Sequence, residues 1–225
     1  MHSQSLTYSV TAFNTAAASE NKIHDDAIAG KFGFTGGLVP GVDDFAYMSH
    51  VPAVTWGREW MAQGRIQARF LKPVYDGDAV SVAGEGAGGA MRLCVTARGV
   101  PRAGGAADRR GAAKPLEVPA APFGDYPNRP AASAESLREG TVLGTISEFY
   151  YADTARSYLR DVRESHDVFD EGRIAPPGFL LRRANSVLAY GVRLGPWIHV
   201  ESDVSMHSHL KDGEPFESRA RVARN

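Results

Sequence analysis

One short stretch near the N-terminus contains residue types that can transfer protons. In SENKIHDD, residues 19–26, Asn21 precedes His24 by three positions. The unperturbed pKa of an imidazole lies near 6.5, so a histidine can both accept and donate a proton at neutral pH. The neighbouring amide could orient a substrate or a water molecule. A histidine beside Asp25 and Asp26 can equally be a solvated loop residue, and the residues alone leave both interpretations open.

A second candidate feature is the helix start in GLVPGVDDF. A Pro-Gly pair favours the beginning of a helix, and the apolar residues after it recur near helical spacing. The first N–H groups of a helix lie at the positive end of its dipole, so they can stabilise a negatively charged oxygen. Gly41 and Val42 are therefore candidate donors. Asp43 and Asp44 could be twin acid–base carboxylates, but adjacent acids in a first turn are more commonly partners of the helix dipole.

Other motifs make weaker cases for a site. His207 and His209 in MHSHL share a strand face, which suits two metal ligands, but no third ligand follows at a suitable spacing. We expect no metal and no cofactor. Arg182 and Arg183 could contact a phosphate group, although ordinary surface pairing is favoured. The glycine-rich residues 84–90 lack the lysine and the strand–loop–helix setting of a phosphate loop.

The composition limits the classes of function. The chain has 225 residues with a net charge of −1, which gives no electrostatic case for nucleic acid or an anionic membrane surface. A single cysteine, Cys94, excludes an intramolecular disulfide and is expected to be a buried apolar thiol. The first residues do not read as a signal peptide, and no apolar run approaches the length of a membrane helix. We expect a cytoplasmic protein.

The pattern of elements divides the chain into two similar halves. Residues 99–138 are rich in Ala, Gly and Pro and show neither hydrophobic period, which predicts a linker between residues 1–98 and 139–225. Each half has a strand-like opening, a Pro-Gly helix start before a long apolar segment, and an alternating strand that enters an Asp-Gly turn, YDGD or KDGE. This repeat predicts an α+β fold in which an antiparallel sheet wraps around a long central helix in each half. The second half stops soon after its turn, so its sheet is expected to lack a strand or to be cut short.

These residues resemble the hotdog superfamily, and within it the MaoC-like dehydratases and (R)-specific enoyl-CoA hydratases. That family has an Asp-x-Asn-Pro-x-His element before the helix, a Pro-Gly helix entry and a strand that ends in a Pro-Val-x-x-Gly-Asp turn. SENKIHDD, GLVPG and FLKPVYDGDAV match it in the first half. Asn21 and His24 match the element, whereas Ser19 replaces the aspartate and Lys22 the proline.

The second half retains less of the same element. VRESHDVF, IAPPGFL and HLKDGEPF are the matching stretches. Glu164 stands at the aspartate position, His166 at the asparagine and Phe169 at the histidine. Neither half therefore has the complete acid–base pair of the family.

The resemblance implies a double hotdog that hydrates an enoyl thioester or dehydrates a 3-hydroxyacyl thioester, such as an acyl-CoA of fatty acid metabolism. It implies that His24 is the acid–base residue, that Asn21 orients substrate or water, and that Gly41 and Val42 supply the oxyanion donor. Because Ser19 replaces the aspartate, the partner carboxylate would be Glu20, Asp25 or Asp26, or absent.

The resemblance also leaves other functions and assemblies open. A catalytically degraded subunit that binds an acyl thioester is one alternative, because the site has lost its aspartate. A hotdog thioesterase that uses Asp43 or Asp44 is another. The expected assembly is a homodimer or a pairing with another hotdog chain.

Overall fold

The computed structural model describes residues 4–111 and 114–224, and its elements repeat in two halves. The elements of the first half are β1 (Gln4–Thr11), the 3₁₀ helix η1 (Lys22–His24), α1 (Asp26–Lys31), α2 (Gly41–Trp56), α3 (Arg58–Gln63), β2 (Arg65–Phe70), β3 (Ala79–Ala87), β4 (Ala90–Ala97) and β5 (Val100–Asp108). After the short η2 (Tyr126–Asn128), those of the second half are β6 (Val142–Phe149), α4 (Ala152–Asp161), η3 (Asp167–Gly172), α5 (Pro177–Gly191), β7 (Glu201–Ser205) and β8 (Pro215–Arg221).

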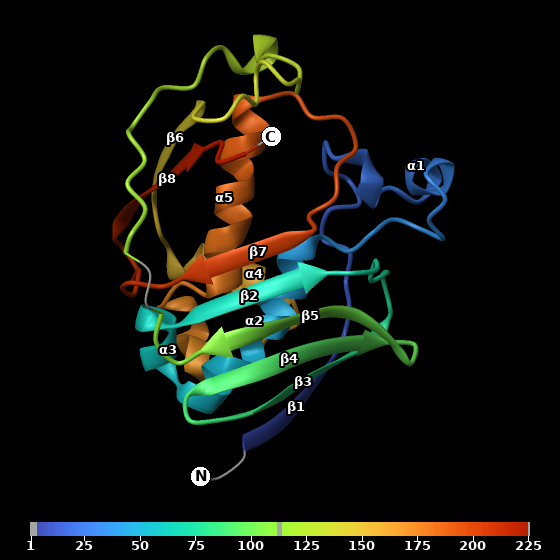
Figure 1. Cartoon of the computed structure of the whole chain (residues 1–225), viewed down its shortest axis with the longest axis vertical. Helices are drawn as coiled ribbons and strands as arrows, with labels where there is room; N and C mark the ends of the chain where they lie inside the picture. The colour runs from blue at the N-terminus through green and yellow to red at the C-terminus, as the bar shows by residue number, and fades with distance from the viewer. Residues whose placement is uncertain (1–3, 112–113, 225) are drawn as a thin grey trace.

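The two halves share a sheet. Six antiparallel strands run in the order β1-β3-β4-β5-β2-β7, and β6 pairs with β8 in a separate two-stranded sheet. Strand β7 comes from the second half but pairs with β2 of the first half, with Ile66 opposite Val204 (Figure 1). The main-chain ladder between β2 and β7 therefore joins the halves directly.

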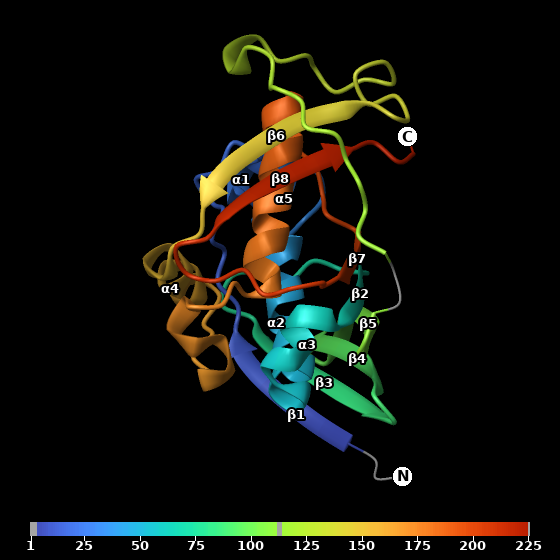
Figure 2. The ribbon, with the colours of Figure 1, turned by 90° about the vertical axis from the view of Figure 1, so that its left-hand side faces the viewer.

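The long helix α2 forms the centre of the first half. Every residue from Val42 to Ala53 is buried, and the helix packs against β1, β2, β3 and β4. A helix that is buried on all sides needs apolar residues around its whole circumference, which explains its weakly amphipathic sequence. In Figure 2, α5 stands above α2 with β6 and β8 across it. None of the helices in residues 4–111 and 114–224 has the length and apolar character that a bilayer crossing requires.

The first part of the predicted linker is a strand. Residues 100–108 form β5 and pair with both β4 and β2. A Cβ atom on Gly105 would lie 1.9 Å from the Gln67 carbonyl oxygen and 3.2 Å from Met48 Cε. Small residues are therefore needed where β5 passes beneath α2. These small residues give the segment the same composition as a linker. The connection between the halves begins after Asp108 rather than at residue 99.

The predicted repeat of elements is present. Strands β1 and β6, helices α2 and α5, and strands β2 and β7 correspond in order, and both Asp-Gly turns place their glycine at positive φ, 76° for Gly77 and 82° for Gly213. In the first half β4 and β5 lie between β3 and β2. Within the described residues of the second half, no strand occupies the corresponding place between β8 and β7.

The single cysteine lies on the outer face of β4. Met91, Leu93 and Val95 alternate inward, which leaves Cys94 exposed. The prediction of a buried thiol is therefore wrong, because strand alternation rather than residue type decides which face a side chain occupies.

Candidate active site

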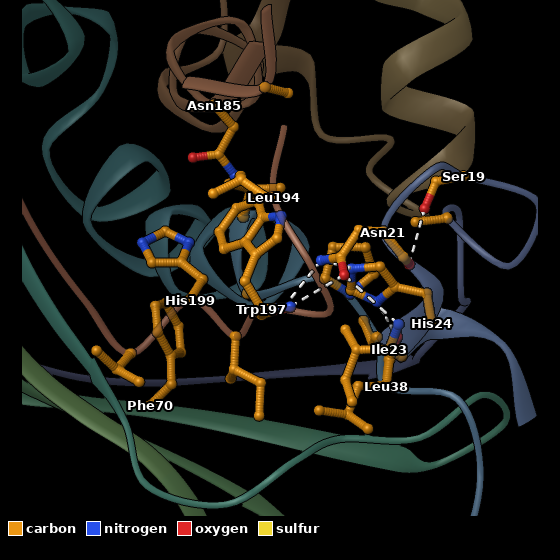
Figure 3. Close-up of a pocket in the computed structure, with 18 of the residues that line it drawn as sticks. Ser19, Asn21, Ile23, His24, Leu38, Phe70, Asn185, Leu194, Trp197 and His199 are labelled. Atoms are coloured by element: carbon orange, nitrogen blue, oxygen red, sulfur yellow. Dashed lines mark hydrogen bonds between the residues drawn. The ribbon is translucent and has the colours of Figure 1, made fainter. Parts of the chain in front are cut away.

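A cavity of about 550 Å³ lies where the two halves meet. The segment before α1, the start of α2, the end of β2, helix α5 and residues 194–200 enclose it (Figure 3). Its wall is mainly apolar, and its volume falls within the range of small-molecule pockets. His24 lines this cavity and is partly buried.

Hydrogen bonds fix the tautomer of His24. Its Nδ1 lies 2.6 Å from the Leu38 carbonyl oxygen, which can only accept, so Nδ1 carries the proton. Its Nε2 therefore carries the lone pair, which accepts a hydrogen bond from the Asn21 amide nitrogen at 3.3 Å. Burial lowers the pKa of His24, with the Leu38 carbonyl and the charge of Asp43 opposing. The ring is a neutral base at neutral pH.

The side-chain amide of Asn21 joins the two halves across the cavity. Its Nδ2 donates to the Trp197 carbonyl at 2.9 Å, and its Oδ1 accepts the Trp197 N–H at 3.2 Å. Nδ2 also faces His24, and Oδ1 also accepts the N–H of Ile23. The Ser19 hydroxyl donates to the Asn21 carbonyl at 3.2 Å. Asn21 thus holds both the histidine and the segment around Trp197.

The three candidate partner carboxylates bond to other groups. Glu20 pairs with a buried arginine at 2.7 Å, Asp25 accepts an N–H of the first turn of α1 at 2.9 Å, and Asp26 accepts a loop N–H at 2.7 Å. Among the described residues, no carboxylate forms a hydrogen bond with the His24 ring.

The start of α2 presents backbone donors beside the cavity. Asp43 and Asp44 donate their N–H groups to the Pro40 carbonyl, at 2.8 and 3.1 Å. No hydrogen bond recorded in the described chain uses the N–H of Gly41 or Val42, and both residues line the cavity. These two groups can stabilise a developing oxyanion.

Both first-turn aspartates are buried, a feature that the sequence interpretation as dipole partners did not anticipate. Asp43 is 0% exposed and accepts from Arg182 at 2.7 Å and from the Thr15 hydroxyl at 2.6 Å. Asp44 is 4% exposed, lines the cavity, and its Oδ1 has no hydrogen-bond partner. Burial raises the pKa of Asp44 well above its usual value, and the charges of Asp43 and Asp78 raise it further. The sequence signal that could have indicated the burial of these two aspartates is that α2 has apolar residues on every side.

Comparison with solved structures identifies the architecture. A protein from Mycobacterium tuberculosis described as having a double hotdog fold matches with a TM-score of 0.60 at 14% identity, over 97% of this chain and 83% of that chain. A MaoC-like dehydratase matches with a TM-score of 0.53 at 12% identity, over 96% of this chain and 86% of that chain. The chain has a double hotdog fold. The sequence matches no family model and no curated protein.

The second hotdog contributes a histidine that the sequence interpretation missed. The His199 Nε2–H donates to the Glu201 carbonyl at 3.0 Å, the Ser202 hydroxyl oxygen lies 2.8 Å from the same Nε2, and the buried Nδ1 has no partner. A Cβ atom on Gly41 would lie 2.8 Å from His199 Cβ, so only glycine lets this segment close over the start of α2. Strand β7 begins at Glu201, so His199 lies just before it, and Val200 is 61% exposed.

The degenerate motif of the second hotdog lies at a different place. Glu164 Oε2 is 2.6 Å from Nδ1 of His50, a residue of α2. Tyr8 stacks on the His50 ring with centroids 3.7 Å apart, His166 meets it edge-on, and Phe169 is buried in the core. This cluster fastens the second hotdog to α2.

His207 and His209 lie in the loop between β7 and β8 rather than on a shared strand face, and they form no metal site in the described residues. No group of three or more His, Cys, Asp or Glu side chains in residues 4–111 and 114–224 could hold a metal ion. The His209 Nε2 atom lies 2.7 Å from the Arg58 carbonyl oxygen, and His207 is exposed. Arg183 pairs with Glu148 at 2.6 Å, away from the cavity around His24.

Proposed function

We propose that this chain is a hydratase or dehydratase that acts on an enoyl or 3-hydroxyacyl thioester, with CoA as the carrier. The observation that carries the proposal is the neutral His24, which lines an apolar cavity beside the start of α2 and whose Nε2 is the unprotonated ring nitrogen. The apolar wall suits an acyl chain, and the only polar groups the chemistry requires are a base, an acid and an oxyanion donor. A MaoC-like dehydratase also has this fold.

In the hydration direction, His24 Nε2 takes a proton from water while the water oxygen attacks C3 of the enoyl thioester. Negative charge moves to the thioester oxygen, where the N–H groups of Gly41 and Val42 stabilise it together with the helix dipole. Protonation of C2 completes the addition. Asn21 keeps the ring in place, and dehydration follows the same steps in reverse.

Replacement of His24 tests the proposal. We expect the parent protein to hydrate crotonyl-CoA, seen as loss of the absorbance of the conjugated thioester, and His24→Ala to lower kcat by about 10²- to 10⁴-fold. His207→Ala is the matched control, because His207 is exposed and does not line the cavity. Equal activity of His24→Ala and the parent protein would contradict the proposed role of His24.

Thioester hydrolysis is a second candidate function, because the Asp44 carboxyl lines the same cavity. Hydrolysis releases a free thiol and hydration does not, so a thiol reagent separates the two activities. A third outcome is turnover of neither kind with an acyl-CoA-dependent rise in Tm, which would support a binding or partner subunit that has lost the family aspartate.

A further inference from the structure

Asp44 is an unpartnered carboxyl at the wall of the cavity. It lies in the first turn of α2, three residues after Gly41, and is 4% exposed. No hydrogen bond recorded among the described residues uses either of its side-chain oxygens, and Oδ1 is fully buried. Leaving a buried polar group unsatisfied costs on the order of 1–3 kcal/mol, so such groups call for a functional explanation.

The neighbouring aspartate shows that the fold can satisfy a carboxyl at this turn. Asp43 receives hydrogen bonds from Arg182 and from the Thr15 hydroxyl. Asp44 receives none, although it is equally removed from solvent. Asp44, which lines the cavity, is thus the aspartate left with free hydrogen-bonding capacity.

The surroundings of Asp44 favour its neutral form. Asp43 on the same helix and Asp78 before β3 raise its pKa in addition to burial. Arg182 of α5 pairs with Asp43. A protonated carboxyl can donate a proton but cannot act as a nucleophile or a base, which disfavours hydrolysis through Asp44.

Two titratable residues whose pKa values are shifted in opposite directions therefore line one cavity. Burial lowers the pKa of His24 and leaves it a neutral base, whereas it raises the pKa of Asp44 and leaves it a neutral acid. Environments that push two titratable groups apart in this way mark the base and the acid of a reaction.

We propose that Asp44 is the general acid of this site, standing in from α2 for the carboxylate that Ser19 replaces. The inference rests on the proposed hydratase function. The water O–H bond breaks toward His24 Nε2, and the C3–O bond forms as the π electrons move onto the thioester oxygen. The Asp44 O–H bond then breaks as its proton adds to C2. His24, now protonated, returns a proton to the Asp44 carboxylate through water, so the net change is the addition of one water molecule.

The test compares Asp44→Asn with Asp153→Asn in the full chain. Asp153 is also in the first turn of a helix, but it is exposed on α4 and does not line the cavity. We expect Asp44→Asn to lower kcat for crotonyl-CoA hydration by about 10²-fold or more and Asp153→Asn to leave it unchanged. The parent rate should fall at high pH as Asp44 ionises, and this decline should be absent from the residual activity of Asp44→Asn.

The outcomes separate this inference from the proposed function. If the parent hydrates crotonyl-CoA and Asp44→Asn keeps its rate within threefold, Asp44 is not the acid but the hydratase function stands. If Asp44→Asn loses thiol release instead of hydration, Asp44 serves hydrolysis and the inference is overturned. A parent without hydration overturns both.

An infrared measurement on the parent protein keeps the inference testable should Asp44→Asn fold poorly. The carbonyl stretch of a protonated carboxyl should be present at pH 7 and should shift when a non-reactive acyl thioether of CoA binds. Absence of any protonated carboxyl at pH 7 would overturn the proposal without reference to a variant.

Discussion

A carboxyl that stays protonated in the folded chain makes folding stability depend on pH. The pKa of Asp44 is raised well above the usual 3.8, so between these two values the folded state holds a proton that the unfolded state releases. Stability from this group is fully present below about pH 4 and is lost as the pH rises toward the folded pKa. Asp44→Asn has no such loss. The free energy of unfolding of Asp44→Asn, relative to that of the parent, should therefore grow by about 1.4 kcal/mol for each pH unit between the unfolded and the folded pKa of Asp44.

Urea unfolding between pH 4 and pH 8 measures this difference. Asp153→Asn is the matched control, because Asp153 is exposed and does not line the cavity. A constant difference for Asp44→Asn would show that its carboxyl ionises normally in the folded chain.

At the level of single residues, the sequence predicted part of the candidate site. His24 could be placed at the cavity from its motif, and Gly41 from its helix start. Asp44 was misjudged because an acid in a first turn normally faces solvent, and burial of the turn depends on packing from elsewhere in the fold. His199 was missed because it reaches the site from the other half, 175 positions after His24 (199 minus 24), and no local pattern encodes that contact.

A partly buried ion pair joins the two long helices. Arg182 of α5 contacts Asp43 of α2 at 2.7 Å, and the side chains are 28% and 0% exposed. Removal of one partner leaves a buried charge uncompensated. Arg182→Met should therefore lower the free energy of unfolding by about 3 kcal/mol, and the double variant Asp43→Asn with Arg182→Met should lose less than the two single variants added together.

A helical arginine in an exposed pair is the control for this cycle. Arg156→Met breaks the pair with Asp153, whose side chain is 86% exposed, and should cost less than about 1 kcal/mol. Additive losses in the Asp43 and Arg182 cycle would mean that the two side chains do not stabilise each other.

Element order was predictable, whereas strand boundaries were not. The Pro-Gly starts of α2 and α5 and the two Asp-Gly turns are local signals, and all four appear in the structure. Strand β5 was mistaken for linker because its glycines serve a tight contact with Gln67 and Met48. That contact involves residues far apart in the chain, so composition alone could not distinguish it from flexibility.

In the whole molecule the two hotdogs pack against each other as one body and are not separate domains joined by a linker. Strand β7 extends the sheet of the first hotdog, α5 packs on α2, and the cavity is lined by both halves. The site therefore exists only when the halves are docked. A change that weakens docking should loosen both halves even if it lies far from the cavity.

The pair of His50 and Glu164 allows that coupling to be tested. Their side chains are 10% and 8% exposed and lie between α2 and the loop after α4, outside the cavity around His24. Glu164→Gln keeps the size of the side chain but removes the charge that faces the His50 ring, and it should lower the free energy of unfolding by about 1–3 kcal/mol.

If the halves unfold together, hydrogen exchange should accelerate by the same factor in the most protected amides of α2 and of α5. Glu117→Gln, an exposed change in the connection, should leave both unchanged. Acceleration confined to one helix would show that the hotdogs open independently, and the cavity would then be a transient contact between them instead of a preformed site.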